Sequence, residues 1–573
     1  MSDELTAVDV VANSQPYRVP RAPTPVDLYL DGNEGATPPA SLLAVLEELD
    51  AEDLRRYPST QKLEELLAKR LGLQAAQVLV TAGADDAIDR ACRAVLGPGR
   101  NAVVPVPTFE MVPRFAAMTG ASVRRVQYGA SGYPLQAVLD AVDDQTGLVV
   151  VISPNNPTGI TATLEQIATL SAQCPRALIL VDHAYVEFSE HDVTEAAVEF
   201  PNVLVTKTLS KAWGLAGMRV GYAVGQTRVV EWLRTAGGPY PVSRPSLVVA
   251  ARWLENGQQR VERFVDRVVD ERRRLSALLD EVGGRPVQSQ ANFVFARVGD
   301  GLWWRDAMAG LGIGVRAFPG RPGLEDAMRI ACPGSESVME RLEQAIRIVA
   351  TPQAILFDLD GVFADVSKSY RQAVIKTAAS YGVQVDAAEI TAAKAAGDAN
   401  NDWRVTRNLL ADRGVQADLE EVTRRFEEFY QGTGEVAGLW QEEQLLAEPE
   451  FLRRLRDQGV ALAIVTGRPR RDARRFVEHW KIGQFFDAMV CMEDAALKPD
   501  PAPVRLAMER LGIERAWFVG DTPDDMRAGR AAGVLPLGIV APEEDEATMK
   551  QPLLMAGAGR VLDSLDELFE VLP

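Results

Sequence analysis

The sequence predicts an α/β protein built from two sheet-containing domains, and three observations lead to this fold class. First, 573 residues are too many for one ordinary hydrophobic core. Second, short apolar runs alternate with helix-length segments over about residues 77–225, as in a mainly parallel sheet covered on both faces. Third, a new strand-like run starts abruptly at residue 353, and further runs follow it after a long helical stretch.

The elements of the first half follow in chain order. Its strand-like runs are QVLVTAG, AVVPVPTF, SVRRVQY, GLVVVISP, ALILVDHAYVEF, NVLVTKTLS and VGYAVG. A charge-rich helical region covers roughly residues 245–282, and NFVFARV, GIGVRAF and MRIACPG then predict a smaller α/β domain. We therefore expect residues 1–350 to form a large domain at about 40–245 and a small domain from the N-terminal arm and about 246–350.

The second half is expected over residues 353–573 and begins with QAILFDLDG directly after Thr351-Pro352. Because this connection is so short, the two halves should be in contact. Residues 365–459 have a helical pattern, and strand-like runs return at VALAIVTGR, FFDAMVCM, AWFVGDTP and PLGIV. The helical stretch is therefore expected to be an insertion between strands of a second sheet.

Composition limits the classes of function. With 47% hydrophobic and 25% charged residues, no signal peptide in MSDELTAVDV and no apolar run long enough to cross a bilayer, we expect a cytoplasmic protein. A formal charge of −19 argues against a general affinity for nucleic acid. The cysteines form no CxxC pair and the histidines no cluster, which argues against a disulfide framework or a zinc site.

Four motifs of the first half carry chemistry. TKTLSKAWGLAGMR follows a strand and contains Lys211 in a Ser-Lys pair, with Arg219 downstream. VDHAY ends a strand with Asp182 and continues to Tyr185, and SPNNPTG places Asn156 in a loop directly after another strand. VTAGADDAID runs from a strand through a glycine into a helix, whose free N-terminal N–H groups can bind phosphate.

At these residues the chain resembles the fold-type I aminotransferases, which use pyridoxal phosphate, and within them the histidinol-phosphate aminotransferase branch, over about residues 15–350. The resemblance implies that Lys211 binds the cofactor and then moves the substrate proton. Asp182 would pair with the ring nitrogen, while Asn156 and Tyr185 would bond the phenolic oxygen. The residues implied around the cofactor phosphate are Ala84, Asp85, Thr208, Ser210 and Arg219.

Two aromatic residues belong to the same resemblance. Phe109 stands where the family stacks a ring on the cofactor, and Tyr57 matches a residue lent across a dimer interface to the partner's cofactor phosphate. A homodimer is therefore implied. Each motif alone also has an interpretation without a catalytic role, since a lone lysine is usually solvated, NPTG is a common turn and Asp182 could cap a helix. Four motifs in the family's order favour the cofactor assignment.

The resemblance also implies residues that bind the small-molecule substrate. Arg316 and Arg329 would grip an anionic group, because an arginine fork donates two parallel hydrogen bonds, although they could instead form structural ion pairs. Tyr17 of the N-terminal arm would assist at a phosphate, and Asn33 is retained in DGNEG. This segment lacks the usual NPYG-type sequence and His183 stands where glutamate is usual, so the amino donor and acceptor stay open.

The second half holds four further motifs, each at a predicted strand end. They are FDLDGV with Asp358 and Asp360, VTGR with Thr466, a Lys-Pro pair at Lys498, and VGDTPDD with Asp521 and Asp525. A DLDG sequence alone is a common polar turn, but the four motifs in this order resemble the haloacid dehalogenase superfamily over about residues 353–573. The resemblance implies a Rossmann-like domain, a helical cap at about residues 365–459 and a magnesium-dependent phosphatase.

The roles in this phosphatase follow from the resemblance. Asp358 would become an aspartyl-phosphate, and Asp360 would protonate the leaving alcohol and then activate water. A halide leaving group needs no proton, so Asp360 favours phosphoryl transfer over dehalogenation. Thr466 and Lys498 would hold the phosphoryl oxygens. The implied Mg²⁺ ligands are Asp358, the backbone carbonyl of Asp360, Asp521 and, from nearby, Asp525.

Residues of the helical cap would select the substrate. Lys394, Asn400 and Arg404 are candidates, but they could equally be ordinary helix-surface groups. Nothing in the sequence pattern decides between these two interpretations.

The leading function hypothesis joins the halves through one intermediate. An aminotransferase using imidazole-acetol phosphate and glutamate would make histidinol phosphate and 2-oxoglutarate, and the phosphatase would release histidinol. Alternatives are an aminotransferase of another aromatic or phosphorylated amino acid, or a threonine-phosphate decarboxylase, with an unrelated phosphatase. A half that is only a degenerate binding module is a further alternative, against which the intact Lys211, Asp182, Asp358, Asp360 and Asp521 argue.

Overall fold

The computed structural model describes residues 5–129, 132–397, 401–542 and 544–572. The chain divides into two compact units. The first unit consists of Met1–Val19, Leu30–Gly299 and Ala327–Glu340, and the second of Pro20–Tyr29, Asp300–Asp326 and Arg341–Pro573. Both are α/β, which confirms the predicted fold class, whereas the domain boundaries expected from the sequence stay a prediction.

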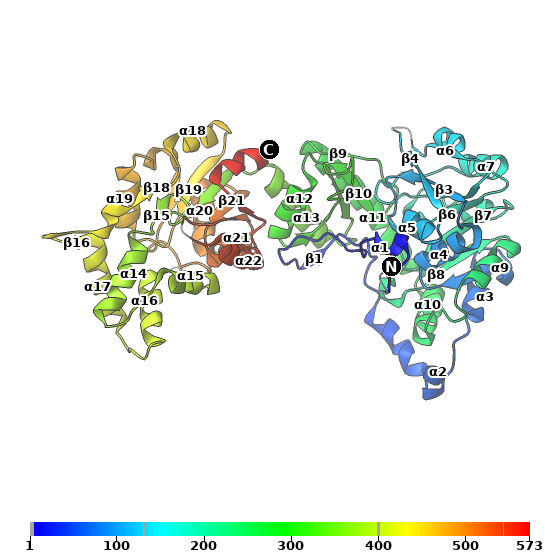
Figure 1. The fold of residues 1–573 in the computed structure, drawn as a ribbon, viewed down its shortest axis with the longest axis horizontal. Helices are drawn as coiled ribbons and strands as arrows, with labels where there is room; N and C mark the ends of the chain where they lie inside the picture. Colours follow the sequence, from blue (N-terminus) through cyan, green and yellow to red (C-terminus); the bar gives the residue numbers. More distant parts are fainter. Residues whose placement is uncertain (1–4, 130–131, 398–400, 543, 573) are drawn as a thin grey trace. The chain divides into compact units, whose positions relative to one another are not determined.

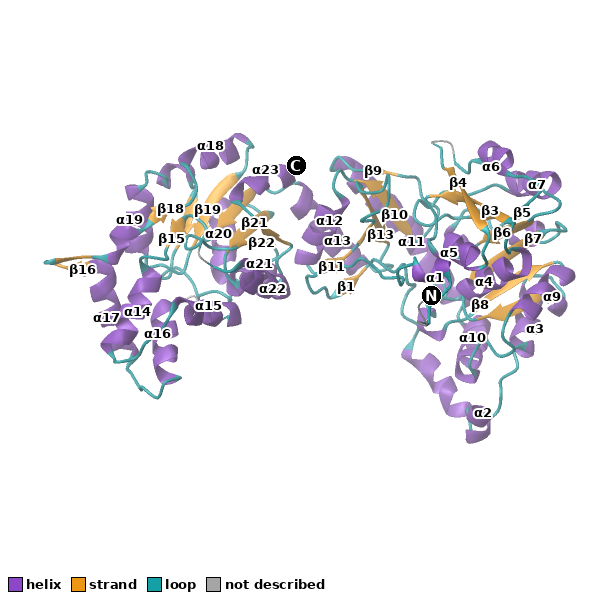
Figure 2. Cartoon of the chain, viewed as in Figure 1, coloured by secondary structure: helices purple, strands orange, loops and turns teal. Residues whose placement is uncertain are grey.

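A seven-stranded sheet forms the centre of the first unit (Figures 1 and 2). Its strands, in spatial order, are β2 (Val78–Thr81), β8 (Gly221–Gly225), β7 (Val203–Thr208), β6 (Leu178–Asp182), β5 (Thr146–Ile152), β3 (Asn101–Val106) and β4 (Ser122–Gln127). Strand β8 is antiparallel to both of its neighbours, and all other pairs are parallel. Because the carboxyl ends of parallel strands meet at one edge, the loops after β5, β6 and β7 are brought together there.

Helices cover this sheet because its central strands are apolar on both faces. Every residue of β5, β6, β7 and β8 is buried. Helix α4 (Ala84–Val95) packs Ile88, Ala91 and Cys92 into the same hydrophobic cluster as Leu180 and Leu204 of the sheet. Since α4 starts directly after β2, this packing fixes the N-terminus of the helix beside the carboxyl edge of the sheet.

The other elements of the first unit surround this core. Its helices are α1 (Asp9–Ala12), η1 (Ala40–Glu48), α2 (Ala51–Arg55), α3 (Gln61–Arg70), η2 (Ala75–Gln77), α5 (Met111–Met118), α6 (Leu135–Ala141), α7 (Leu164–Gln173), η3 (Val186–Phe188), α8 (Thr194–Ala197), η4 (Ala216–Met218), α9 (Thr227–Ala236), α10 (Arg244–Asn256) and α11 (Gln258–Glu281). The strands β9 (Arg285–Pro286), β10 (Phe293–Arg297) and β13 (Ala327–Ala331) belong to a smaller, four-stranded sheet, in which β10 lies between β9 and β13 and is antiparallel to both. Helix α13 (Glu336–Ala350) begins in this unit and ends in the second.

The second unit contains a six-stranded sheet in which every pair of neighbours is parallel. Its strands, in spatial order, are β20 (Ala488–Val490), β19 (Ala461–Val465), β14 (Ala354–Phe357), β21 (Ala516–Gly520), β22 (Leu535–Ile539) and β23 (Arg560–Leu562). The helices between them are α18 (Pro449–Asp457), α19 (Arg470–His479), η6 (Gly483–Phe485), α20 (Ala502–Leu511), α21 (Pro523–Ala532), α22 (Glu546–Ala556), η7 (Leu565–Glu567) and α23 (Leu568–Val571). Strand β14 is central, so the loop after it lies between the loops after β19 and β21.

A helical insertion separates β14 from β19, as the sequence predicts (Figure 1). It contains α14 (Tyr370–Ser380), α15 (Ala387–Ala396), α16 (Asp402–Ala411), α17 (Leu419–Gln431) and η5 (Leu439–Glu442). Short strands that the sequence pattern does not reveal accompany the helices: β15 (Ala364–Asp365) pairs with β18 (Gln444–Leu445), and β16 (Gly432–Thr433) with β17 (Val436–Ala437). The β15–β18 pair joins the entry and exit of the insertion. The cap range expected at about residues 365–459 stays a prediction.

Within the second unit, segments that precede residue 351 contact the six-stranded sheet domain, as the short Thr351-Pro352 connection predicts. These segments hold β1 (Leu28–Tyr29), α12 (Gly301–Gly310), β11 (Ile313–Gly314) and β12 (Arg316–Ala317). The ring of Trp303 in α12 lies 5.4 Å from that of Trp517 in β21, whose Nε1 donates a 2.8 Å hydrogen bond to the Ile348 carbonyl. A Cβ on Gly310 would lie 2.8 Å from the Gly559 Cα, so this close approach requires glycine.

No helix within the described ranges has the length and apolar character needed to cross a membrane.

Candidate active sites

Lys211 lies in the turn after β7, where two other segments approach it. Its Nζ donates a 2.9 Å hydrogen bond to the Gly32 carbonyl and is 5.6 Å from the centre of the Tyr185 ring. A Cβ on Gly35 would lie 1.8 Å from the Lys211 carbonyl oxygen, so only glycine allows the segment of residues 32–35 to pass here. The DGNEG sequence therefore positions the lysine backbone as well as its side chain.

Asp182 ends β6 and is 4% exposed. The hydroxyl of Thr206, on the neighbouring strand β7, donates a 2.9 Å hydrogen bond to its Oδ1. Burial raises the pKa of this carboxyl to about 7, because a desolvated carboxylate is costly, while the Thr206 bond acts in the opposite direction. A buried carboxyl of this kind is suited to pair with a cationic ring nitrogen.

Asn156, Tyr185, Asn33 and Arg329 are joined by hydrogen bonds. Asn33 Nδ2 donates to the Tyr185 hydroxyl at 3.1 Å, and Arg329 Nη1 donates to Asn156 Oδ1 at 2.6 Å. Arg329 Nη2 also donates to the Asp31 carbonyl at 2.6 Å, so the segment of residues 31–33 contacts both pairs. The structure thus brings these four predicted residues together, and Tyr185 connects them to Lys211.

The predicted phosphate-binding residues converge at the N-terminus of α4. Gly83 precedes the helix with φ +82°, and a Cβ there would lie 2.7 Å from Arg219 Nη2. Arg219 Nη2 lies 3.2 Å from Asp85 Oδ2, and Thr208 donates a 2.9 Å hydrogen bond to Ser210. Thr208 pairs with Gly221, which abuts the Gly83–Ala84 peptide. Free N–H groups at a helix start, hydroxyls and an arginine are the donors that a phosphate needs.

Other predicted residues have neighbours outside this group. Phe109 is partly buried and packs against the core of the first unit. Tyr57 and Tyr17 are 80% and 46% exposed, and among the described residues neither hydrogen-bonds to the group around Lys211. Tyr57 stacks on Tyr240 with ring centres 4.4 Å apart. Arg316 is buried in the second unit, with its guanidinium 5.8 Å from the Phe318 ring.

His183 stands at the position where the sequence resemblance to the aminotransferases leads one to expect glutamate. It is 1% exposed, and its Nδ1 lies 2.8 Å from the Thr194 hydroxyl. Burial lowers its pKa to about 3, so the ring is neutral at ordinary pH. His183 is therefore a packed histidine within the first unit.

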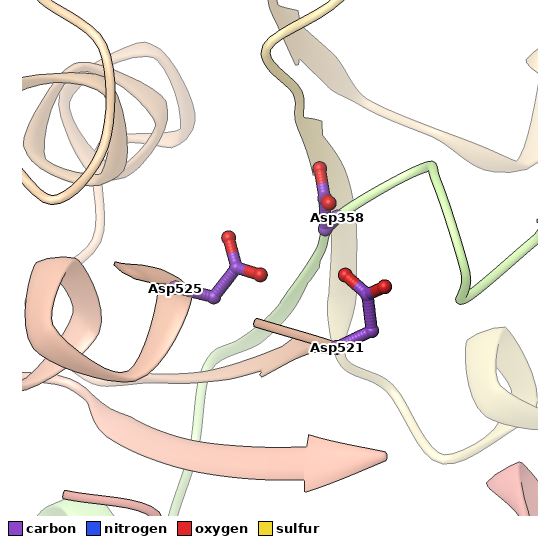
Figure 3. A group of neighbouring side chains, drawn as sticks. All are labelled: Asp358, Asp521 and Asp525. Atoms are coloured by element: carbon purple, nitrogen blue, oxygen red, sulfur yellow. The ribbon is translucent and has the colours of Figure 1, made fainter. Parts of the chain in front are cut away.

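Three buried carboxylates meet at the carboxyl edge of the second sheet (Figure 3). Asp358 follows β14, Asp521 follows β21 and Asp525 lies in the first turn of α21, with ligand oxygens all within 4.8 Å of one another. Burial raises the pKa of Asp358 to about 7 and that of Asp521 well above its ordinary value. Asp521 Oδ1 is buried without a hydrogen-bond partner among the described residues. This donor set fits a hard divalent cation.

Lys498 partly neutralises the three carboxylates. Its Nζ lies 2.9 Å from Asp358 Oδ1 and 2.5 Å from Asp525 Oδ1. Asp525 is also held by the backbone N–H and hydroxyl of Thr522, at 3.0 and 2.6 Å. Thr466 follows β19 and is 4% exposed. The side chain of Asp360 lies outside the carboxylate cluster, so its expected metal contact through the backbone carbonyl stays a prediction.

A buried ion-pair network that the sequence did not predict holds Asp360. Arg468 Nε lies 2.5 Å from Asp360 Oδ1, and Arg468 Nη1 lies 2.9 Å from Glu443 Oε2. Glu443 Oε1 accepts hydrogen bonds from Tyr430 at 2.9 Å and Ser369 at 3.0 Å. The only signal for Arg468 is its place in VTGR, and no local pattern indicates Glu443, because its partners lie far away in the sequence.

A narrow cavity is lined by Asp358 and Asp521. It is also lined by Asp360, Tyr370, Lys394, Asn401, Asp402, Trp403, Gly467, Arg468, Pro469, Met492 and Thr522. Of the predicted cap candidates, Lys394 lines this cavity, Arg404 is exposed, and Asn400 lies outside the described residues. Tyr370 and Trp403 come from α14 and α16, and sequence reasoning missed both.

Comparisons with known proteins agree with this geometry. The family model "Aminotransferase class I and II" matches residues 26–346, and "Haloacid dehalogenase-like hydrolase" matches residues 355–539. The chain is 34% identical over 303 residues to an aromatic amino acid aminotransferase of Corynebacterium efficiens, covering 51% of this chain and 86% of the relative. It is 33% identical over 292 residues to a histidinol-phosphate aminotransferase of Chlorobium phaeovibrioides, covering 50% and 81%.

A third relative is an imidazoleglycerol-phosphate dehydratase of Phytophthora nicotianae, which is 43% identical over 242 residues. This match covers 39% of the chain and 54% of the relative. The chain therefore spans about half the length of that relative.

Solved structures show the same fold for the first part of the chain. The histidinol-phosphate aminotransferase of Sinorhizobium meliloti, in complex with pyridoxal phosphate, has a TM-score of 0.52 and 25% identity, covering 56% of this chain and 92% of that one. The Clostridium acetobutylicum enzyme of the same name, at 19% identity with a TM-score of 0.51 and covering 56% and 98%, supports the fold alone. The chain therefore belongs to the class I and II aminotransferase family and carries a haloacid dehalogenase-like hydrolase domain after its aminotransferase domain.

Proposed function

We propose that the chain is a bifunctional enzyme that transaminates imidazole-acetol phosphate with glutamate and then hydrolyses the histidinol phosphate formed. The observations that support this proposal are Lys211 beside Gly32 and Tyr185 in one unit and the cluster of Asp358, Asp521 and Asp525 in the other. Relatives named histidinol-phosphate aminotransferase support the first substrate. A shared phosphorylated intermediate would explain why the two activities reside in one chain.

The aminotransferase family implies pyridoxal phosphate, and the side chains around Lys211 fit it. When bound, this cofactor supplies an electron sink for a negative charge on the substrate Cα. Asp182 would accept the ring N–H, which gives its buried carboxylate a cationic partner. The helix α4 N-terminus, Thr208, Ser210 and Arg219 would hold the phosphate. Asn156 and Tyr185 would bond the phenolic oxygen.

The proton transfers are assigned to Lys211. Its amine would remove the proton from the substrate Cα and deliver it to the reacting carbon of the cofactor. Arg329, with Arg316 and Tyr17, would hold the anionic group of the substrate at a fixed distance from this amine. Since Arg329 already bonds Asn156 and the Asp31 carbonyl, its guanidinium is orientated before a substrate arrives.

The phosphatase chemistry is assigned to Asp358 and Asp360. A carboxylate oxygen of Asp358 would attack phosphorus, the bond between phosphorus and the ester oxygen would break, and Asp360 would give its proton to that oxygen. Asp360 would then take a proton from water as this water attacks the phosphorylated Asp358 and releases phosphate. Mg²⁺ at Asp358, Asp521, Asp525 and the Asp360 carbonyl would supply positive charge for the phosphoryl oxygens. Thr466 and Lys498 would hold the same oxygens.

We also propose that the protein works as a homodimer. Family members are typically dimers, and the exposed Tyr57–Tyr240 stack is a surface that a partner subunit would bury. In this arrangement Tyr57 would reach the cofactor phosphate of the partner.

A coupled assay tests the proposed pair of reactions. Purified protein with pyridoxal phosphate and Mg²⁺ is given imidazole-acetol phosphate and glutamate, and 2-oxoglutarate, histidinol phosphate and free phosphate are followed together. The expected result is 2-oxoglutarate first and phosphate after a lag. If aromatic 2-oxo acids are transaminated but imidazole-acetol phosphate is not, the aromatic aminotransferase alternative is correct. If histidinol phosphate persists while another phosphate ester is hydrolysed, the consecutive pairing is wrong.

A further inference from the structure

The cavity over Asp358 and Asp521 is bounded on one side by the helical cap. Tyr370 is the first residue of α14 and Trp403 lies in the first turn of α16, and both line the cavity together with Asp358 and Asp521. The Arg468 guanidinium, which pairs with Asp360, lies 4.9 Å from the Tyr370 ring. Since Asp360 would protonate the ester oxygen, the alcohol part of a substrate would lie on the side of the cavity formed by Tyr370.

Three of the residues that line this cavity carry a buried hydrogen-bond donor without a partner in the described part of the chain. The Tyr370 hydroxyl, Trp403 Nε1 and Arg468 Nη2 are all buried without a hydrogen bond to any described residue. Tyr370 is 6% exposed, and Arg468 is 2% exposed. A buried donor left unsatisfied costs about 1–3 kcal/mol, so three of them around one cavity indicate that something else completes them.

The chemistry of these donors limits what can complete them. Indole and guanidinium groups only donate, and a tyrosine hydroxyl can donate as well. Lys394 adds an ammonium group to the lining, while Asp402 and Asp360 are the carboxylates available to a cation. The phosphoryl oxygens already have proposed partners in Lys498, Thr466 and the metal. The unpartnered donors therefore remain for an acceptor on the alcohol.

We propose that this cavity binds the alcohol part of the phosphate ester and selects alcohols whose hydrogen-bond acceptor, such as a ring nitrogen, is bonded by Tyr370 and Trp403. This inference rests on the proposed phosphatase function and specifies the substrate class of the same site. A flat heteroaromatic ring would meet apolar ring surface from Tyr370 and Trp403 and their donors at its edge. Arg468 would contribute its Nη2 while its Nε holds Asp360.

A matched pair of esters isolates the acceptor. The compounds 2-(imidazol-4-yl)ethyl phosphate and 2-phenylethyl phosphate have the same linker and similar ring size, but only the first has ring nitrogens. We expect wild-type kcat/KM to favour the imidazole ester by about tenfold or more, because leaving buried donors unpaired is costly. Trp403→Phe and Tyr370→Phe, each of which removes one donor but keeps an aromatic ring, should each lower this ratio about fivefold.

Two control variants separate this effect from loss of packing. Tyr381→Phe removes a hydroxyl that is likewise buried and unpartnered at the end of the same helix, but Tyr381 does not line the cavity. Trp480→Phe makes the same change as Trp403→Phe at the end of α19, also outside the cavity. Both should keep the wild-type ratio. Circular dichroism and thermal melting check that every variant is folded.

The outcomes distinguish this inference from the proposed function. A wild-type ratio near one, or a ratio unchanged in both Tyr370→Phe and Trp403→Phe, overturns the assignment. Equal losses on both esters would mean that the two residues serve the phosphoryl group, which also overturns it. If the ratio behaves as expected but histidinol phosphate is not hydrolysed, the inference stands and the histidinol-phosphate pairing falls. If the protein hydrolyses no ester at all, the phosphatase function and this inference are both wrong.

Discussion

The two catalytic centres differ in how their buried carboxylates are neutralised. Asp182 has one hydroxyl partner, from Thr206, and its pKa is raised to about 7 by burial. In the phosphatase centre, Asp358 and Asp525 share Lys498, while Asp521 has an oxygen without a hydrogen-bond partner among the described residues. A cation bound at either proposed centre would stabilise its buried carboxylates, but the proposed phosphatase centre already carries part of the neutralising charge on Lys498.

This difference has a consequence for the two cofactors. In the first proposed centre, the cationic ring nitrogen of pyridoxal phosphate would neutralise the single carboxylate of Asp182. In the second, a divalent cation together with Lys498 would balance three carboxylates. Removal of one cofactor should change only its own centre. Variants that remove one charged group at a time can test this comparison.

The largest expected effect is a clean separation of the two activities. Asp358→Asn keeps the size of the side chain but removes the nucleophile, so phosphate release should fall about 10⁴-fold or more while transamination continues. Lys211→Ala should do the reverse, because the amine that binds the cofactor and moves the proton is lost. The measurements are phosphate release from histidinol phosphate and 2-oxoglutarate formation from glutamate.

Both variants must be folded, because α12 packs Trp303 against Trp517 within the second unit. Thermal melting of each variant is therefore compared with that of wild type. If well-folded Asp358→Asn protein also loses transamination, the model of two independent centres is wrong.

The second effect is a pH dependence of the free energy of unfolding, which the buried carboxyl of Asp182 causes. In cofactor-free protein the folded state keeps a proton on Asp182 up to about pH 7, whereas the unfolded chain loses it near pH 4. The free energy of unfolding should therefore fall by about 1.4 kcal/mol per pH unit as pH rises between these values. Asp182→Asn removes this contribution, so the difference in unfolding free energy between variant and wild type should change by about 2 kcal/mol between pH 5 and pH 7, where Asp182 is already half ionised in the folded state.

Urea unfolding at several pH values measures this difference. Asp140→Asn, at an exposed position whose carboxylate accepts a hydrogen bond from Gln136, is the control and should leave the pH dependence of wild type unchanged. An Asp182→Asn curve parallel to that of wild type would contradict the raised pKa.

Sequence reasoning located these carboxylates but not their surroundings. Asp182, Asp358 and Asp521 each end a continuous apolar run, and β6, β14 and β21 end at or next to them. An apolar run followed by a polar residue is a local signal, so the strands, their order and the fold class could be predicted. The roles of these residues stay predictions.

The contacts made by the cap could not be predicted in the same way. Glu443 bonds Ser369, which is 74 residues away, and Arg468, which is 25 residues away. Such pairs depend on how the cap helices pack, and no local periodicity encodes that packing. For the same reason Tyr370 and Trp403 carry no motif, and the two-residue strands β15 to β18 are too short to show alternation.

The third effect concerns Arg468, which the structure places against Asp360. Arg468→Met keeps much of the side-chain length but removes the groups that hold Asp360 and Glu443. If Arg468 positions the acid, hydrolysis of an alkyl phosphate should fall about 100-fold, because its alkoxide must be protonated. The first turnover on p-nitrophenyl phosphate, measured as a burst of p-nitrophenol, should slow far less, because this leaving group needs no proton, whereas steady turnover also depends on Asp360 activating water.

Asp360→Asn should give the same selective loss, and Arg468→Lys should recover part of the activity on the alkyl ester. Arg471→Met, on the exposed side of α19, is the matched control. Equal losses in the first turnover on both esters with Arg468→Met would show that the residue does not act through protonation of the leaving group.

The smallest expected effect tests whether the aminotransferase centre is shared between subunits. Tyr57→Phe removes a hydroxyl proposed to bond the partner's cofactor phosphate, and one charge-assisted hydrogen bond of about 1.5 kcal/mol corresponds to about tenfold weaker binding of pyridoxal phosphate. Tyr240→Phe keeps the Tyr57–Tyr240 stack and should leave the affinity unchanged. Absorbance titration of cofactor-free protein measures both.

Mixed dimers give the decisive form of this test. When Tyr57→Phe protein is unfolded and refolded with Lys211→Ala protein, a heterodimer contains one centre with both an intact Lys211 and an intact Tyr57 supplied by the other subunit. Half of the heterodimer's centres should then bind the cofactor with wild-type affinity, although neither parent dimer has such a centre. A monomer that binds pyridoxal phosphate with full affinity would rule out the shared centre. Mixed protein that shows only the two parental affinities would also rule it out, because an intact Tyr57 would then have no effect across the interface.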